Sequence, residues 1–408
     1  MITSHNGPQP ADFTDVRATN LAVVLRFVRE NAPCSRADIA ASTGLNKATV
    51  SSLVADLIDR RLLRETGLTE NRVGRPATML VLDGSPYAAI GIEVNVDYLT
   101  AIAVDLAGSE LVSWRRSFPG ATASANQAVA AIAGIARRVM GRMVKDARQV
   151  LGLTVAVPGL VDVSGCVRVA PNLGWQDVEL AGDLSKALRD PGFPVLVDND
   201  ANLAVLAEHR FGPHGSTANL VYLTGEIGVG AGVIMDGGLR RGSQGFAGEI
   251  GHIEIDPTGA DCRCGRRGCL EAVAGIGAVI QHIAPDATPA ELELEVDEVV
   301  RLARSGDRGM LDLLAGVGRN LGKGVAVLAG VLNPDVVIVG GYFVPLAPWL
   351  LPAAEEELLR RSIAPGAGGC TLVASTLGYG AAALGAAARV LDSVDSGRLP
   401  QTRPEMGS

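Results

Sequence analysis

Apolar side chains recur at helical spacing in the first part of the chain and at strand spacing farther on, which predicts two regions of different construction. The first helix covers residues 17–31 and places four apolar side chains on one face, at Leu21, Val24, Leu25 and Val28. Two more helices follow. Ser35 and Asp38 resemble a capping box, Gly44 supplies a turn, and Asn46 can cap the next helix. The spacing of these segments is typical of a helix-turn-helix.

Two short strands and a loop come after the helix-turn-helix. Residues 62–66 and 77–83 read as strands, and the loop 67–76 between them is rich in Gly, Asn and Arg, as expected of a wing. We therefore predict a flexible N-terminus at 1–16 and a DNA-binding winged helix-turn-helix domain at 17–82. A three-helix bundle used only for protein contacts is the alternative. The residues expected at the DNA are Ser35, Arg36, Asn46, Lys47, Thr49, Ser51 and Ser52, with Arg72 and Arg75 in the wing.

From Tyr87 onward, strand patterns alternate with helical patterns, including an Ala-rich helix near 123–145 and another long helix near 309–332. Such alternation indicates an α/β body with mostly parallel strands. Two sheets are needed to use all of these strands, so we expect two lobes with a cleft between them. The body is predicted to span 83–392, and 393–408 reads as a flexible tail.

Composition and charge narrow the environment and the partners. Of the 408 residues, 48% are hydrophobic and 20% are charged, which suits a globular chain of several packed units. Because no apolar run approaches the roughly 20 residues that cross a bilayer and no signal-peptide core is seen, we expect a soluble cytoplasmic protein without a membrane partner. Residues 1–82 carry 10 Lys and Arg against 8 Asp and Glu, whereas the remainder carries 26 against 36. DNA contacts are therefore expected from the N-terminal part.

The segment 248–275 concentrates one histidine and three of the six cysteines. His252, Cys262, Cys264 and Cys269 form a Cys3His set suited to tetrahedral Zn2+. Four protein ligands leave no open position, so we expect one structural zinc per chain. Reduced thiols or a disulfide are the alternatives. A disulfide is disfavoured because Cys262 and Cys264 are too close to pair easily and because three thiols are an odd number.

Acidic residues accompany these metal ligands. Glu249 and Glu271 flank the cluster, and a zinc ion that orders the loop would turn their carboxylates into preorganised hydrogen-bond acceptors. Carboxylates and an imidazole that converge on one point suit a ligand with many hydroxyl groups. Each carboxylate oxygen accepts from a hydroxyl, and a metal-bound imidazole keeps one N–H to donate. The expected ligand is a sugar.

Several segments resemble the ROK family of repressors, unassigned reading frames and sugar kinases. "GEIGH" followed by "CRCGRRGCLE" looks like the family signature, "VPGLVDVSGCVRVAPNLGW" and "VDNDANLAVLAE" are similar to its sugar-binding segments, and the winged helix ending in "GRPA" resembles its repressor branch. The resemblance implies a two-lobed, actin-like body of the hexokinase and ribonuclease H type behind the winged helix. It also implies a dimer or tetramer, and a sugar site made of Gly159, Asn172, Asn199, Asp200, Glu249, His252 and Glu271.

The resemblance gives Asp200 a specific meaning. In the family's kinases the aspartate of the matching "ND" pair takes the proton from the sugar hydroxyl that attacks ATP. The segments matching the phosphate loops differ, however: "GIEVNVDYL" stands where kinases resemble "GIDIGGTK", and "GEIGVGAG" where they resemble "GTGVGGG". Asp97 and Glu226 would oppose the charge of a nucleotide. We therefore expect no catalytic residue and no ATP, with Asp200 as a vestigial base position.

Together these features predict a sugar-responsive transcriptional regulator, a repressor that a sugar releases from a palindromic operator. The first alternative is an ATP-dependent sugar kinase that carries a DNA-binding domain. The second is a zinc-stabilised protein-interaction scaffold, for which no sugar binding would be expected. The sequence leaves glucose, xylose and N-acetylglucosamine open as the sugar.

Overall fold

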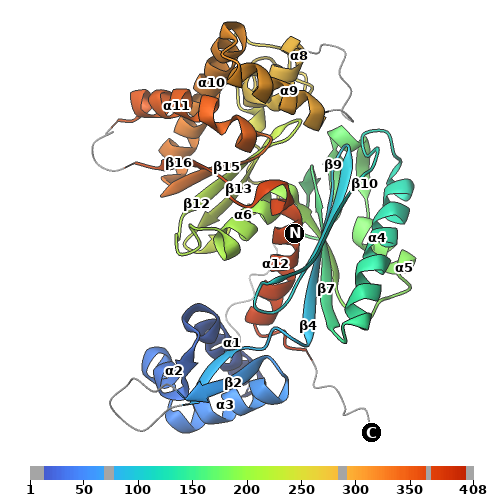
Figure 1. The fold of residues 1–408 in the computed structure, drawn as a ribbon, viewed down its shortest axis with the longest axis vertical. Coiled ribbons are helices and arrows are strands. Elements are labelled where there is room, and N and C mark those ends of the chain that lie inside the picture. The colour runs from blue at the N-terminus through green and yellow to red at the C-terminus, as the bar shows by residue number, and fades with distance from the viewer. Residues whose placement is uncertain (1–12, 69–77, 284–291, 364–368, 401–408) are drawn as a thin grey trace, which may run out of the picture.

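A computed structural model describes residues 13–68, 78–283, 292–363 and 369–400. It divides into a small N-terminal domain and two lobes stacked above it (Figure 1). No helix within these described residues is both long enough and apolar enough to span a bilayer.

The N-terminal domain is the predicted winged helix. Its elements are α1 (Phe13–Asn31), β1 (Cys34–Ser35), α2 (Arg36–Thr43), α3 (Lys47–Asp59), β2 (Leu63–Leu68) and β3 (Thr78–Leu82). The three strands form an antiparallel sheet in the order β1-β3-β2. Helix α1 begins at Phe13, inside the segment 1–16 that was expected to be flexible. The wing connection with Arg72 and Arg75 lies outside the described residues.

The local signals read from the sequence account for the helix boundaries in this domain. Ser35 and Asp38 exchange both hydrogen bonds of a capping box at the start of α2. Gly44 ends α2 in the left-handed conformation, with φ of 73°, which a residue with a Cβ adopts at a cost. The side chain of Asn46 then accepts from the Thr49 N–H at 2.8 Å and starts α3.

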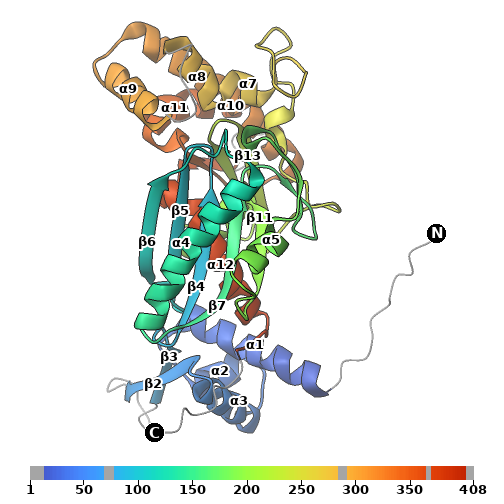
Figure 2. The same ribbon diagram turned by 90° about the vertical axis from the view of Figure 1, so that its right-hand side faces the viewer.

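The first lobe is built on a five-stranded sheet. Its strands are β4 (Tyr87–Val94), β5 (Tyr98–Val104), β6 (Glu110–Ser117), β7 (Gln149–Val157) and β11 (Val195–Asn199), in the order β11-β7-β4-β5-β6. Helices α4 (Ala125–Lys145) and α5 (Leu180–Ala187) cover one face (Figure 2). A small sheet beside it contains β8 (Leu160–Val161), β9 (Val167–Ala170) and β10 (Trp175–Val178).

The second lobe contains another five-stranded sheet, in the order β14-β13-β12-β15-β16. Its strands are β12 (Leu220–Gly225), β13 (Val229–Met235), β14 (Gly238–Leu239), β15 (Val336–Gly341) and β16 (Thr371–Ala374). Five helices belong to this lobe: α7 (Leu270–Ala274), α8 (Ile276–Ile283), α9 (Leu292–Arg304), α10 (Arg308–Leu332) and α11 (Phe343–Arg361).

Strand direction differs from the prediction of mostly parallel strands. In each five-stranded sheet two of the four pairings are antiparallel: β4-β5-β6 in the first lobe and β12-β13-β14 in the second. The connections explain the difference. Strands β4 and β5 are joined by the short turn 95–97, which reverses the chain, whereas the parallel neighbours β15 and β16 are joined through helix α11.

Two helices lie between the lobes, α6 (Asp200–Phe211) and α12 (Ala381–Asp395) (Figure 1). Helix α12 packs on β4 and β7, α6 packs on β12 and β13, and the two helices pack on each other. Glycine makes these close approaches possible. A Cβ on Gly91 of β4 would lie 1.9 Å from the Ala383 carbonyl oxygen, and one on Gly385 would lie 1.7 Å from that of Leu203. The central stack therefore depends on small residues rather than on large apolar side chains.

The winged helix is docked on the first lobe and on α12 through a shared apolar core. Leu25 and Val28 of α1 belong to the same buried cluster as Val390 and Leu391 of α12. Figure 2 shows α1 crossing the lower end of the body beside the end of α12. Helix α12 continues through Asp395, so it includes the first three residues, 393–395, of the predicted tail.

Candidate functional site

The four predicted metal ligands lie together. The ligand atoms of His252, Cys262, Cys264 and Cys269 are all within 4.8 Å of one another. His252 Nδ1 is 3.7 Å from Cys262 Sγ, and the Sγ atoms of Cys264 and Cys269 are also 3.7 Å apart. Two ligand atoms that each lie about 2.3 Å from a tetrahedral Zn2+ are separated by about 3.7 Å. The residues therefore fit a single tetrahedral metal ion.

Two glycines let the loop bring the thiols together. Gly265 has φ of 85°, and its N–H donates to the Cys262 carbonyl at 3.0 Å, closing the turn between two ligands. Gly268 has φ of 66°, and a Cβ there would lie 1.6 Å from the Asp256 carbonyl oxygen. The spacing of the three cysteines thus depends on backbone conformations that other residues adopt with strain.

Asp200 lies at the junction of β11 and α6 on the opposite side of the cleft. Its Oδ1 accepts from Asn199 Nδ2 at 2.9 Å and from the Ala201 N–H at 2.9 Å. Asn199 Nδ2 also donates to the Gly159 carbonyl at 3.1 Å, and Asn199 caps α6. A Cβ on Gly159 would lie 2.5 Å from the Val169 carbonyl oxygen, so the backbone approaches closely here. Three predicted sugar-site residues are therefore joined by hydrogen bonds.

The remaining predicted sugar residues come from the second lobe and from the small sheet. Glu249 precedes the short 3-10 turn Ile250–His252, and Glu271 lies in the first turn of α7. Burial raises the pKa of Glu249, and Glu271 adds to the rise while His252 opposes it. Asn172 in the turn Pro171–Leu173 accepts from Arg263 of the cysteine loop at 3.2 Å. This hydrogen bond joins the two lobes next to the metal ligands.

The protonation of Asp200 is set by the same surroundings. Burial raises the pKa of Asp200 to about 7, and the negative charge of Glu249 across the cleft also acts to raise it. The carboxyl is thus poised to change charge near neutral pH. Hydrogen bonds from Asn199 and Ala201 favour the ionised form and limit the rise.

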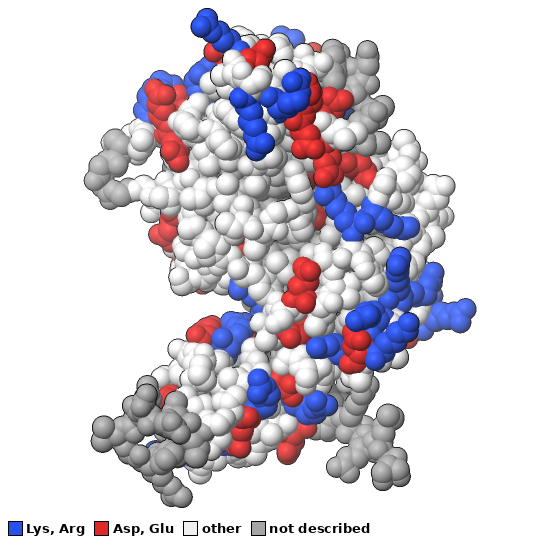
Figure 3. Space-filling view, viewed as in Figure 1, with Lys and Arg blue, Asp and Glu red and all other residues white. Residues whose placement is uncertain are grey.

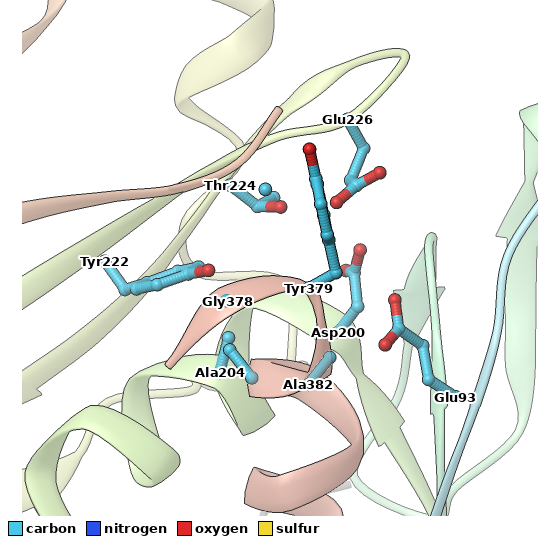
Figure 4. Close-up of a pocket in the computed structure, with 11 residues that line it drawn as sticks. Glu93, Asp200, Ala204, Tyr222, Thr224, Glu226, Gly378, Tyr379 and Ala382 are labelled. Carbon is cyan, nitrogen blue, oxygen red and sulfur yellow. The ribbon is translucent and has the colours of Figure 1, made fainter. Parts of the chain in front are cut away.

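A small pocket extends from Asp200 toward the loops that resemble phosphate-binding segments. It has an empty volume of about 260 Å3 and is lined by Glu93, Asp200, Tyr222, Thr224, Glu226 and Tyr379, among others. Figure 4 shows the three carboxylates facing this space. Burial raises the pKa of Glu93 to about 7 and that of Glu226 well above its ordinary value. The pocket is therefore crowded with carboxyl groups.

The side chain of Asn95 fills the turn between β4 and β5. Asn95 is buried, and its Oδ1 accepts from the Val96 N–H at 2.7 Å. Its Nδ2 donates to the Tyr98 hydroxyl at 2.8 Å and to Glu226 Oε2 at 3.2 Å. Because Glu226 belongs to the second lobe, Asn95 connects the lobes at this end of the cleft.

Sequence reasoning missed several residues at this end of the cleft. Arg115 of β6 pairs with Glu293 of α9 at 3.1 Å and lies 4.1 Å from the ring centroid of Tyr98. Glu93 carried a usable signal, because it is an acidic residue inside an otherwise apolar strand. Arg115 carried none, since its partner lies far away in the sequence.

The predicted DNA-contacting residues separate into two groups. Lys47, Ser51 and Ser52 are exposed on α3, and Thr49 is partly exposed beside them. Asn46 caps α3, and Arg36 pairs with Glu65 at 2.8 Å. Ser35 is only 7% exposed, and its hydroxyl is committed to the capping box of α2. Figure 3 shows acidic and basic side chains mixed over this domain on the face drawn.

Comparison with known proteins gives the family. Residues 89–393 match the ROK family. The chain belongs to the ROK family. Residues 22–71 match the MarR family, so a MarR-type DNA-binding domain precedes the ROK body. The resemblance noted in the sequence and the predicted fold class are thereby confirmed.

Three transcriptional regulators are similar to this protein over most of its length. It is 31% identical to the xylose repressor of Bacillus subtilis over 382 residues, covering 94% of this chain and 97% of that protein. It is 28% identical to the DNA-binding transcriptional dual regulator NagC of Escherichia coli over 394 residues, covering 95% of each. A ROK family transcriptional regulator homologous to the E. coli MLC protein matches with a TM-score of 0.80, 27% identity, and 94% and 98% coverage.

A ROK family kinase also shares the body. The glucokinase of Streptomyces griseus, solved with glucose and AMPPNP, matches with a TM-score of 0.60 and 27% identity, covering 74% of this chain and 98% of its own. The kinase therefore resembles the two lobes, whereas the transcriptional regulator resembles nearly the whole chain.

Proposed function

We propose that this ROK protein is a sugar-responsive transcriptional repressor that leaves its operator when a sugar or sugar derivative enters the cleft. The observation that carries the proposal is the winged helix packed on α12, one of the two helices between the lobes. A change in lobe arrangement at the cleft would move α12 and, with it, the DNA-binding domain. The relatives named xylose repressor and NagC support the same class of function.

The sugar is held from both lobes in this proposal. Asp200 and Asn199 bind hydroxyl groups from one side, together with Gly159 and Asn172. Glu249, His252 and Glu271 bind from the other. Ionised carboxylates accept hydrogen bonds from hydroxyls, and the amide of Asn199 already fixes the position of the Asp200 carboxyl at 2.9 Å. Contacts from both lobes favour one closed arrangement over others.

Zinc is the metal we propose for the Cys3His cluster. His252, Cys262, Cys264 and Cys269 would hold it, and a bound zinc ion would supply a structural cross-link that fixes the loop. His252 presents Nδ1 to Cys262 Sγ at 3.7 Å, which leaves Nε2 as its nitrogen for a sugar hydroxyl. The same histidine would therefore connect metal and sugar.

We further propose that the protein transfers no phosphoryl group. Asn95 fills the β4-β5 turn, and Glu93 and Glu226 bring carboxyl groups to the space where a kinase would need to neutralise phosphate charge. A sugar kinase with an attached DNA-binding domain is the second candidate. It is favoured by Asp200 alone, because a buried carboxyl with a pKa of about 7 suits a general base.

The DNA partner is proposed to be a palindromic operator bound by a homodimer or tetramer. One recognition helix reads only a few base pairs, so two copies related by two-fold symmetry would read two half-sites. Lys47, Thr49, Ser51 and Ser52 of α3 would contact DNA, with Arg36 and Asn46 nearby. The predicted wing contacts Arg72 and Arg75 lie outside the described residues.

An operator selection tests the function directly. Full-length protein is used to enrich duplexes from a random DNA pool, and the affinity for the enriched duplex is measured with and without glucose, xylose and N-acetylglucosamine. We expect one palindromic duplex and one sugar that weakens its binding. Enrichment of no duplex would contradict the repressor proposal, and unchanged affinity with every sugar would contradict its sugar response.

A further inference from the structure

A second and larger cavity lies away from the cleft residues described above. We call it the α12 pocket. Its lining residues are Thr154, Asp162, Val163, Ser164, Gly165, Ala181, Val195, Leu196, Val197, Asp198, Arg241 and Arg389. The empty volume, which includes space open to solvent, is about 670 Å3. None of the seven proposed sugar residues lines it.

Most of the charged groups that line the α12 pocket are already paired. Asp162 is satisfied by Arg168 at 2.7 Å and by the hydroxyl of Ser164. Asp198 forms an ion pair with Arg241. Within the described part of the chain, Arg389 makes neither a hydrogen bond nor an ion pair. The guanidinium N–H groups of Arg389 are therefore left without an acceptor among the described residues, although the negative charges of Asp198 and Asp392 act on it.

The surroundings of Arg389 leave its hydrogen-bonding groups free for a ligand. Burial lowers the pKa of its guanidinium and the like charge of Arg241 lowers it further, whereas the negative charges of Asp198 and Asp392 act to raise it. Partial burial of N–H donors that lack acceptors costs stability, and an anion bound beside Arg389 would supply the acceptors.

Thr154 gives an independent sign of a missing partner. It is completely buried on β7, and among the described residues its hydroxyl has no hydrogen-bond partner. A buried hydroxyl without a partner costs about 1–3 kcal/mol. The neighbouring wall includes Val163, Ala181 and Val195, so the pocket combines apolar surface with the guanidinium of Arg389 and one unsatisfied hydroxyl.

We propose that the α12 pocket binds a small organic anion whose carboxylate or phosphate group pairs with Arg389 and whose apolar part lies against Val163, Ala181 and Val195. A guanidinium presents paired N–H donors that match both kinds of anion. Binding of the anion does not depend on the sugar site or on the operator, because it concerns a different cavity, whereas any effect of the anion on operator binding rests on the proposed function.

The location of Arg389 gives such a ligand a route to the DNA-binding domain. Three residues farther along α12, Asp392 accepts from Arg210 at 2.9 Å, and Asp395 pairs with both Arg210 and Arg29 of α1. An anion at Arg389 would therefore act on the same helix that holds the winged helix. We infer that it serves as a second effector of operator binding, separate from the sugar.

Two model anions and a neutral analogue test the binding. Full-length protein is titrated with benzoate, phenyl phosphate and benzamide at constant ionic strength, by calorimetry and by thermal shift. At least one anion should bind at least tenfold more tightly than benzamide, and comparison of the two distinguishes a carboxylate site from a phosphate site. Equal binding of all three compounds, or binding of none, would overturn the proposal.

Variants and a measurement on the unaltered protein locate the site. Arg389→Gln should weaken binding of the preferred anion at least tenfold, and Arg389→Lys should weaken it less. Arg240→Gln is the matched control, since Arg240 pairs with Asp236 and does not line the pocket. In the wild type, the anion should also slow the modification of Arg389 by phenylglyoxal, read by mass spectrometry, without slowing that of Arg240. Unprotected Arg389 would place the anion elsewhere and refute the assignment.

Discussion

Arg29 of the winged helix and Asp395 of α12 form an ion pair that joins residues 366 positions apart. Asp395 is 6% exposed and also pairs with Arg210 at 2.7 Å, so the connection is partly shielded from solvent. Helix α12 lies between the two lobes, while α1 belongs to the DNA-binding domain. The pair therefore connects a helix that lies between the lobes to the DNA-binding domain.

Arg29→Gln should weaken the coupling between sugar and operator while leaving the affinity for sugar unchanged. Such coupling is typically worth about 1–3 kcal/mol, a factor of about 5–150 in operator affinity. We expect the variant to lose a measurable part of that factor when operator binding is titrated with and without saturating sugar. Arg26→Gln is the control, because Arg26 is exposed on the same helix. Equal sugar responses of wild type and Arg29→Gln would argue against this connection.

Metal content should be one zinc per chain in the purified protein and well below one in Cys264→Ser. Removal of one ligand of four leaves an incomplete tetrahedral site, and the three remaining side chains hold the ion much more weakly. Elemental analysis measures the loss, and Cys370→Ser, a cysteine outside the cluster, is the control. Circular dichroism should show the rest of the protein still folded. Undiminished zinc in Cys264→Ser would exclude Cys264 from the ligand set.

Features formed by residues close together in the sequence could be predicted, whereas features formed by residues far apart in the sequence could not. Capping at Ser35 and Asn46 is a local event, and the cysteine cluster is contained within one loop, so both were visible in the sequence. The α12 pocket was not, because Thr154 and Arg389 meet only after β7 and α12 have packed together. The antiparallel pairings, which are half of those in the two five-stranded sheets, were not predicted for a different reason. The alternation of strands and helices was interpreted as parallel pairing, although short turns join several strands directly.

The pH dependence of stability should change when Asp200 becomes Asn. The pKa of this carboxyl rises from an ordinary 3.8 to about 7 in the folded protein. Folding therefore favours the protonated form, and this contribution to stability is complete below about pH 4 and is lost as the pH rises through 7. Each pKa unit corresponds to about 1.4 kcal/mol, so Asp200→Asn should remove about 2–4 kcal/mol of the decline between pH 4 and 8.

Denaturant unfolding without sugar at several pH values measures this effect. Glu355→Gln serves as the control, since Glu355 is exposed on α11 and should leave the pH profile unchanged. An unaltered decline in Asp200→Asn would mean that Asp200 is already ionised at low pH in the folded state. The raised pKa would then be wrong, and with it the case for Asp200 as a group that changes charge near neutrality.

ATP turnover should be absent when the protein is given a sugar that it binds. Asn95 fills the β4-β5 turn and Glu226 contributes a buried carboxyl, so the phosphates of ATP would meet neither open backbone nor positive charge. A coupled nucleotide assay gives the measurement, with the Streptomyces griseus glucokinase as the active control. Turnover near the roughly 1–100 per second common among kinases would instead favour the sugar-kinase candidate.

Lys47→Ala and Ser35→Ala should have different effects, although the sequence predicted a DNA contact for both residues. Lys47 is exposed at the start of α3, so its loss should weaken operator binding severalfold and lower the salt dependence by about one counterion, with stability unchanged. Ser35 is buried in its capping box, so its loss should cost about 1 kcal/mol of stability and leave the operator affinity of the folded protein intact. Anisotropy titrations across salt concentrations and denaturant unfolding separate the two outcomes, with Lys145→Ala on α4 as a charge control. Should Ser35→Ala lose operator affinity at full stability, its hydroxyl would have to leave the cap to reach DNA.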